Sequence, residues 1–242
     1  MLKGSFEKSY KFQTIVTEDI LRKIDTYLQS RGDRMAYRFE TINGAKYEVE
    51  NIEEIIGYDN PSDAKIDEIY LMAQKEGRYI PQNFITVKFI NRGRWSSSAS
   101  LYIRNANQDE ISVIFNDMDR VIQKAKADYS WLYNKWVLIS LNFILSELLF
   151  FFLYHYVAPL IKENNASWWI QLFLLQLSIL IPFTMGLLKT LQWVYPETVF
   201  LIGDQKAVYE KLMRRRNWVL GTILTVILGV IASIIATKCF LN

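Results

Sequence analysis

Apolar positions in the second half of the chain gather into three long runs, residues 136–158, 168–191 and 218–240. A helix of about twenty apolar residues is long enough to cross the roughly 30 Å hydrocarbon core of a bilayer. The pattern therefore predicts a membrane protein with three transmembrane α-helices, the first two of which form an antiparallel hairpin across residues 159–167. Six of the seven tryptophans lie near the ends of these runs, as interfacial aromatic residues do.

The first half of the chain has the mixed pattern of a small α+β domain. Apolar residues at helical spacing predict an amphipathic helix over residues 17–28, which Thr17 can cap. The dipeptide Asn43-Gly44 favours a type I′ turn, because it accepts positive φ at both central positions. It predicts a β-hairpin from the strand-like runs on either side, residues 35–41 and 46–49.

Alternating polarity predicts the rest of a small antiparallel sheet. Three more strands are expected at residues 69–72, 84–90 and 98–104. A 3.6-residue apolar period then predicts a long helix over residues 109–133, which covers one face of the sheet and continues stiffly into the first span. The expected organisation is a cytoplasmic α+β domain (1–133), a transmembrane hairpin (134–191), a cytoplasmic connecting segment with a helix (192–217) and a third span (218–240).

Within the connecting segment, residues 199–202 are apolar and extended, and Gly203-Asp204 can start the next helix. We expect this segment either to dock on the α+β domain or to lie on the membrane surface, and docking is favoured because two helices emerge at the same face.

Basic residues set the predicted orientation. Arg214, Arg215 and Arg216 directly precede the third run, and other lysines and arginines also gather on that side. The positive-inside rule then places the N-terminus in the cytoplasm and the C-terminus outside, and we expect a bacterial inner membrane. The N-terminus lacks the apolar core of a signal peptide, so targeting is expected from the internal runs.

Small residues recur every fourth position along the third run, and they form one face of the predicted helix: Gly221, Thr225, Gly229, Ser233 and Thr237. Such a face allows close approach of another helix, so we expect a homo-oligomer that packs through it in the lipid bilayer.

Glu147 stands at the middle of the first run, where a carboxyl group is costly to bury in lipid. Ser140 and Asn142 extend the polar side of the same helix, and Ser178 of the second run aligns with Glu147 in depth. Two interpretations remain open. Glu147 either bonds neighbouring helices together, or it lines a pore or proton pathway within an oligomer.

Composition narrows the classes of site and partner. The net charge of +3 argues against nucleic-acid binding, the single Cys239 excludes an intramolecular disulfide, and the single His155 excludes a histidine-rich metal site. No metal, other cofactor or catalytic residue is predicted, because the chain lacks the phosphate-loop, dinucleotide, zinc-protease and hydrolase motifs.

Residues 48–68 are markedly acidic, with Lys65 as the opposing charge. Glu48, Glu50, Glu53 and Glu54 begin the cluster, and it ends with Asp59, Asp63, Asp67 and Glu68. A solvated face that contacts a cytoplasmic protein partner is the favoured reading, and a metal site is the alternative.

A second polar segment, residues 91–98, holds Arg92, Arg94 and Ser96 between two predicted strands. It is either a polar hairpin loop or a site for a phosphate or nucleotide, since arginine forks suit anions.

These features favour a non-enzymatic sensor or effector, in which the cytoplasmic domain controls an oligomeric helix bundle. Its output would be a pore or altered membrane permeability, as a defence or stress effector needs. The alternative is a membrane-tethered protein-interaction module whose spans serve only as an anchor, and an enzyme acting on a lipid or nucleotide through residues 92–98 is a weaker third hypothesis.

Overall fold

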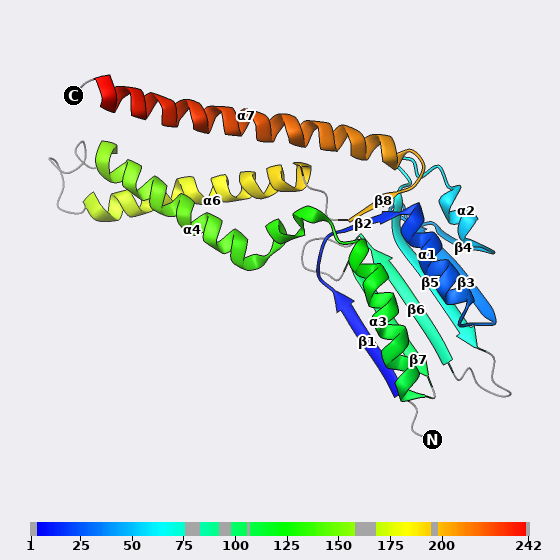
Figure 1. Ribbon diagram of the computed structural model, residues 1–242. Coiled ribbons are helices and arrows are strands. Elements are labelled where there is room, and N and C mark those ends of the chain that lie inside the picture. Colours follow the sequence, from blue (N-terminus) through cyan, green and yellow to red (C-terminus); the bar gives the residue numbers. More distant parts are fainter. Residues whose placement is uncertain are drawn as a thin grey trace.

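The computed structural model describes residues 4–75, 83–91, 98–105, 107–157, 168–194 and 198–240. An α+β part built on a six-stranded sheet is followed by long helices that extend away from one end of the sheet (Figure 1). The strands of the sheet are β1 (Gly4–Tyr10), β3 (Arg34–Thr41), β4 (Lys46–Val49), β5 (Ile66–Lys75), β6 (Asn83–Ile90) and β7 (Ala99–Asn105).

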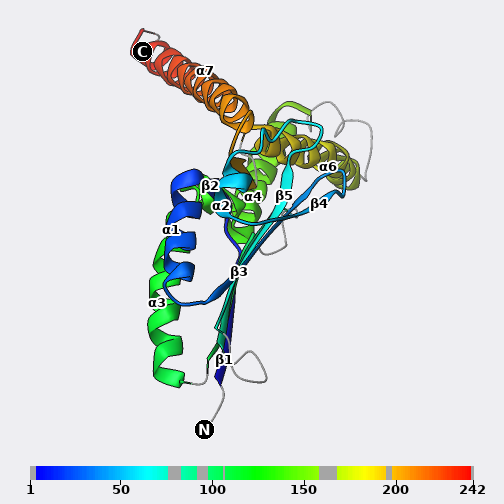
Figure 2. The same cartoon turned by 90° about the vertical axis from the view of Figure 1, so that its right-hand side faces the viewer.

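The sheet is antiparallel, with the order β1-β7-β6-β5-β3-β4. Its strands alternate between buried and half-buried residues, and the buried residues face helices α1 (Glu18–Gln29) and α3 (Gln108–Lys124). Both helices lie on the same side of the sheet (Figure 2). Leu71, Val87 and Leu101 are fully buried on neighbouring strands, and with Leu21 and Met118 of the helices they form the core. The predicted antiparallel sheet with helices is therefore present.

Helix α1 forms where the sequence predicts it. The side chain of Thr17 accepts a hydrogen bond from the backbone N–H of Ile20, and Glu18 and Asp19 occupy the first turn near the positive end of the helix dipole. A second, short helix, α2 (Ile52–Ile56), is capped in the same way by Asn51.

The predicted hairpin is confirmed as β3 and β4, but the predicted turn type is wrong. Gly44 has a φ of 84° whereas Asn43 does not have positive φ. The connection spans residues 42–45, and the N–H of Gly44 donates to the carbonyl of Thr41 at 2.8 Å. A longer loop relieves the need for two successive positive φ values, so one left-handed residue suffices.

The predicted continuous helix over residues 109–133 is also wrong. Helix α3 ends at Lys124, a short 3-10 helix η1 (Asp128–Tyr133) follows, and α4 (Lys135–Phe152) begins after it. The carbonyl of Ala125 accepts from the N–H of Ile15 at 2.7 Å, and Lys126 forms a β-bridge with Thr14. These tertiary backbone bonds compete with continuation of the helix, because a carbonyl bound elsewhere is lost to the helical ladder.

The remaining elements are a π-helical turn η2 (Leu153–Val157), helix α6 (Trp168–Val194), strand β8 (Thr198–Leu201) and helix α7 (Gln205–Phe240). Two polar contacts join α4 to α6: Gln176 Nε2 donates to Ser146 Oγ at 2.9 Å, and Thr184 Oγ1 donates to Asn142 Oδ1 at 3.0 Å. Large apolar side chains of both helices are exposed (examples are Phe143, Leu148, Phe173 and Ile181).

The predicted transmembrane spans are not supported. Within the described residues, no helix combines the length and the apolar character that crossing a membrane requires. The prediction of three spans at 136–158, 168–191 and 218–240 is corrected accordingly: these residues belong to α4, α6 and the later part of α7. Apolar content was overweighted, because the runs also contain polar or charged residues such as Asn142, Glu147, Gln176 and Lys189.

The predicted membrane location depended on those spans and is corrected with them. The expectations of a bacterial inner membrane, a cytoplasmic N-terminus, an external C-terminus and a transmembrane channel all required helices that cross a bilayer. Arg214, Arg215 and Arg216 lie inside one continuous helix, α7, which begins before them at Gln205.

Candidate functional site

The junction between the α+β part and the helices is a two-stranded parallel sheet of segments far apart in the sequence. Strand β2 (Thr14–Thr17) leads directly into α1, and β8 lies between α6 and α7. Their register pairs Thr14 with Thr198 and Thr17 with Leu201. Val16 and Phe200 are buried, at 0% and 3% exposed, so apolar packing supports the backbone pairing.

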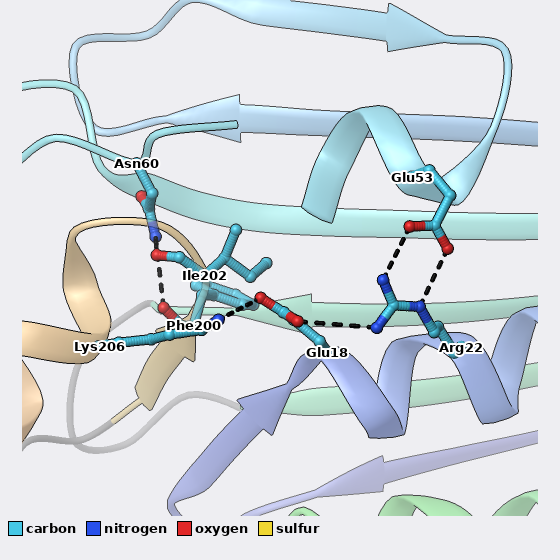
Figure 3. Close-up of polar contacts among 7 residues, drawn as sticks. All are labelled: Glu18, Arg22, Glu53, Asn60, Phe200, Ile202 and Lys206. Carbon is cyan, nitrogen blue, oxygen red and sulfur yellow. Dashed lines mark hydrogen bonds and ion pairs between the residues drawn. The ribbon is translucent and has the colours of Figure 1, made fainter. Parts of the chain in front are cut away.

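The side chain of Asn60 binds the backbone at the end of β8. Its side-chain Nδ2 donates to the carbonyls of Phe200 and Ile202, each at 3.3 Å (Figure 3). Its Oδ1 accepts from the N–H of Ile66 at 2.6 Å. The residue is fully buried and has a φ of 51°, a left-handed conformation that asparagine tolerates better than most residues. The side chain of Asn60 therefore joins the start of β5 to β8 and to the residue that follows it.

Gly203 lets the turn after β8 lie directly on residues 58–59. Its φ is 51°, and a Cβ placed on it would lie 2.1 Å from the carbonyl oxygen of Asp59. The same carbonyl accepts from the N–H of Asp204 at 2.7 Å, and Gln205 Nε2 donates to the carbonyl of Asn60 at 3.0 Å. Helix α7 thus starts in direct backbone contact with the α+β part.

A chain of ion pairs runs from α7 across α1 to α2. Lys206 Nζ lies 2.5 Å from Glu18 Oε1, and Glu18 Oε2 lies 3.6 Å from Arg22 Nη1 (Figure 3). Arg22 in turn holds Glu53 through two parallel hydrogen bonds of 3.0 Å and 2.8 Å. These two bonds lower the pKa of Glu53 below its usual value and raise the pKa of Arg22. Arg22, Glu53 and Lys206 are exposed and Glu18 is half-buried, so salt screens the network.

Two small cavities flank the junction. One, of about 350 Å³, lies between the start of α1 and α7 and is lined by Glu18, Asp19, Lys206, Tyr209 and Glu210. The other, of about 130 Å³, lies beside Asn60 and reaches Tyr209 and Leu212 of α7. Burial, together with the nearby carboxylate of Asp128, raises the pKa of Tyr209 against an opposing effect of Arg216.

The chemistry at this junction suits mechanical coupling between the two parts. The groups present are hydrogen-bonded amides, exposed ion pairs and backbone, and among the described residues no three or more His, Cys, Asp or Glu side chains gather as a metal ion would need. A displacement of α1 or β2 would reach α7 through paired strands and through Glu18 and Lys206.

The predicted polar residues of α4 and α6 do not form one cluster. Glu147 and Ser140 are exposed on α4, whereas Asn142 accepts the hydrogen bond from Thr184 of α6. Ser178 is exposed and donates to the carbonyl of Leu175 in its own helix. The choice between a bonding and a pathway role for Glu147 stays a prediction.

The small-residue face of α7 is open where its surroundings are described. A Cβ added at Gly221 or at Gly229 would meet nothing within 4 Å, and Thr225 Oγ1 donates to the carbonyl of Gly221. Ser233 and Thr237 lie on the same helix, but their side chains are outside the described part. Arg214 and Arg215 are exposed and Arg216 is half-buried. A helix–helix contact at this face stays a prediction.

The two polar segments of the α+β part have different outcomes. Arg92, Arg94 and Ser96 lie outside the described residues. In the acidic region 48–68, Glu48 pairs with Arg38, Glu53 with Arg22 and Glu68 with Lys88. Part of its charge is therefore neutralised within the chain, and a protein partner for it stays a prediction.

The sequence predicted that residues 199–202 are extended and that a helix starts after Gly203-Asp204, and both features are confirmed by β8 and α7. It did not reveal the roles of Asn60, Glu18 and Lys206. The signal for Asn60 is the dipeptide Asn60-Pro61, which is typical of turns, but nothing in the sequence links it to residues 200–202.

The chain matches no protein-family model, none of the curated proteins and no solved structure.

Proposed function

We propose that this protein is a non-enzymatic sensor or effector, in which the α+β part controls the arrangement of the long helices. One observation carries the proposal: β8, which joins α6 to α7, pairs in parallel with β2, which leads into α1. Strand β2, which would move with α1, is therefore hydrogen-bonded to β8, the strand that connects α6 to α7. A flexible linker would give no such coupling.

Two fastenings of different strength support this role. The Asn60 and Gly203 contacts are buried or tightly packed, whereas the Glu18–Lys206 pair joins a half-buried carboxylate to an exposed lysine. Buried polar contacts hold geometry, and exposed ion pairs contribute about 1 kcal/mol or less and respond to their surroundings. In this proposal the Asn60 and Gly203 contacts hold the helices in place, and the Glu18–Lys206 ion pair is the contact that can form or break.

The helices themselves are proposed to assemble with those of further copies of this chain. Trp136 and Phe143 of α4 and Phe173 and Ile181 of α6 are all between 57% and 66% exposed. Large exposed apolar patches mark interaction surfaces, and here the polar contacts lie between α4 and α6 while the apolar side chains face away. A second copy offers the same exposed apolar side chains, so an interface between copies is self-complementary.

Reversing charges across the junction tests the coupling. We expect Glu18→Lys to place a cation beside both Arg22 and Lys206 and to speed amide hydrogen exchange in β8 and the first turns of α7 by about fivefold, the equivalent of about 1 kcal/mol. The double variant Glu18→Lys, Lys206→Glu restores the pair and should return exchange towards the wild-type rate. Unchanged exchange in α6 and α7 for every variant would mean that the helices are independent of the α+β part.

The assembly is tested by the mass of the purified full-length protein. We expect a multiple of the 28.5 kDa chain for the wild type and a smaller mass for Phe143→Asp, which places a carboxylate in the apolar surface. Val113→Asp on α3 is the matched control, because Val113 is also exposed, at 52%, but lies on the α+β part. A wild-type monomer, or apolar helices covered by lipid in place of other copies, would overturn the proposal.

A further inference from the structure

Strand β4 forms one edge of the six-stranded sheet, and β1 forms the other (Figure 1). Within the described residues, β3 is the one strand that pairs with β4. Lys46, Tyr47 and Glu48 are exposed, so none of the described helices and loops covers the strand. The edge strand of a sheet offers backbone groups to which another extended chain can add.

The hairpin fixes which backbone groups of β4 face outward. The N–H of Thr41 donates to the carbonyl of Ala45 at 3.0 Å, which makes these two residues a hydrogen-bonded pair at the turn end of the β3–β4 ladder. Hydrogen-bonded and non-hydrogen-bonded pairs alternate along an antiparallel ladder. Lys46 and Glu48 therefore belong to non-hydrogen-bonded pairs, and their N–H and carbonyl groups point away from β3. This is the hydrogen-bonding pattern that an added strand requires.

An aromatic pair borders this edge on the helix-covered side of the sheet. Tyr47 lies opposite Phe39, which is buried in the core, so the two side chains share that face. Their rings stack at 4.7 Å with an interplanar angle of 14°, and the ring of Tyr58 lies 6.0 Å from that of Tyr47. Tyr47 nevertheless remains 40% exposed. An exposed aromatic ring offers a contact for a guanidinium or ammonium group.

The surroundings of the edge are negative. Glu50 directly follows β4, and Glu54 lies in the first turn of α2, which contacts β4. Within the described part of the chain, neither carboxylate has a cation within ion-pair distance. Burial raises the pKa of Tyr58, and the charges of Asp63 and Asp59 raise it further, so negative potential extends to the aromatic pair.

We propose that the β4 edge binds an extended segment of a partner protein in which lysine or arginine occupies every second position. The backbone of this segment adds a strand beside Lys46 and Glu48. Side chains of a strand alternate between its two faces, so one set of basic residues lies on the side of Tyr47 and α2. Charge complementarity with the acidic region 48–68 selects the partner. This binding does not depend on the proposed coupling of the helices.

Three fluorescent peptides, titrated into the full-length protein at constant ionic strength and followed by anisotropy, test the mode of binding. The first alternates lysine and threonine over about eight residues, the length of an ordinary strand. The second has the same sequence with every backbone nitrogen methylated, and the third has glutamate in place of lysine. We expect the first to bind with a Kd in the micromolar range, and the other two to bind at least tenfold more weakly.

Proline at the first position of β4 tests the backbone contribution by itself. The N–H of Lys46 points away from β3, so Lys46→Pro removes a donor from the outer edge and leaves the β3–β4 ladder intact. We expect this variant to bind the first peptide at least fivefold more weakly. Lys46→Ala is the matched control: it removes the same positive charge but keeps the N–H, so binding should be unchanged or tighter.

Charge reversal locates the binding on the sheet. We expect Glu50→Lys to weaken binding of the first peptide about fivefold, and Glu7→Lys to change it less than twofold. Glu7 is the matched control because it is also exposed but lies on β1, the opposite edge. The inference is overturned if the first peptide does not bind, if the methylated or the acidic peptide binds as tightly, or if Glu7→Lys has the same effect as Glu50→Lys.

Discussion

Gly203→Ala is expected to destabilise the protein by about 3 kcal/mol and to release the junction. The new Cβ would lie 2.1 Å from the carbonyl oxygen of Asp59, which belongs to the backbone and cannot rotate away. Left-handed backbone adds about 1 kcal/mol for alanine, and overpacking adds roughly 1–3 kcal/mol. The measurement is the midpoint of urea unfolding, combined with hydrogen exchange of the amides in β2 and β8, which should lose protection first.

Gly44→Ala provides the control for this substitution. Gly44 also has positive φ, at 84°, but nothing lies within 4 Å of an added Cβ. It should cost only the conformational strain, about 1 kcal/mol, and leave exchange in β8 unchanged. Equal effects of the two variants would show that close packing of Gly203 on Asp59 is unimportant.

Asn60→Ala is expected to be the other most damaging change, at about 3–4 kcal/mol. The substitution leaves the N–H of Ile66 without its acceptor and removes the donor to the carbonyls of Phe200 and Ile202. Asn60 is fully buried. Each buried polar group left unsatisfied costs about 1–3 kcal/mol, and positive φ adds strain for alanine. Urea unfolding gives the total, and exchange of the Ile66 amide reports the local loss.

Asn60→Gly and Asn60→Asp separate the contributions. Glycine accepts the φ of 51°, so it should be about 1 kcal/mol less damaging than alanine. Aspartate keeps the acceptor for Ile66 but turns a carboxylate towards two carbonyl oxygens, so it should remain strongly destabilising at neutral pH. If all three variants unfold within about 0.5 kcal/mol of the wild type, Asn60 does not fasten β8.

Much of the α+β part could be predicted because its signals are local. The amphipathic pattern and the capping residue Thr17 define α1, and alternation defines β6 and β7, since burial of one face demands a period of two. The end of α3 could not be predicted, because Ala125 leaves the helix for a hydrogen bond with Ile15, more than a hundred residues away in the sequence.

The membrane prediction rested on three apolar runs and on the tryptophans and basic residues at their ends, but within the described residues no helix has the length and apolar character to cross a membrane. At the junction, the sequence predicted the extended segment but not its pairing with β2. The strand character of residues 199–202 is local, but pairing with β2 depends on Thr14–Thr17, which carry no mark of their partner.

The contacts of Thr14 have a consequence for how the chain is connected. This one residue forms a β-bridge with Lys126 and also pairs with Thr198, so the chain leaves and re-enters the α+β part at the same point. The α4–α6 hairpin is therefore an insertion whose two ends meet on a single strand. A short linker could replace residues 127–197 with a small loop-closure cost, and the sheet, α1, α3 and β8 would be expected to keep their places.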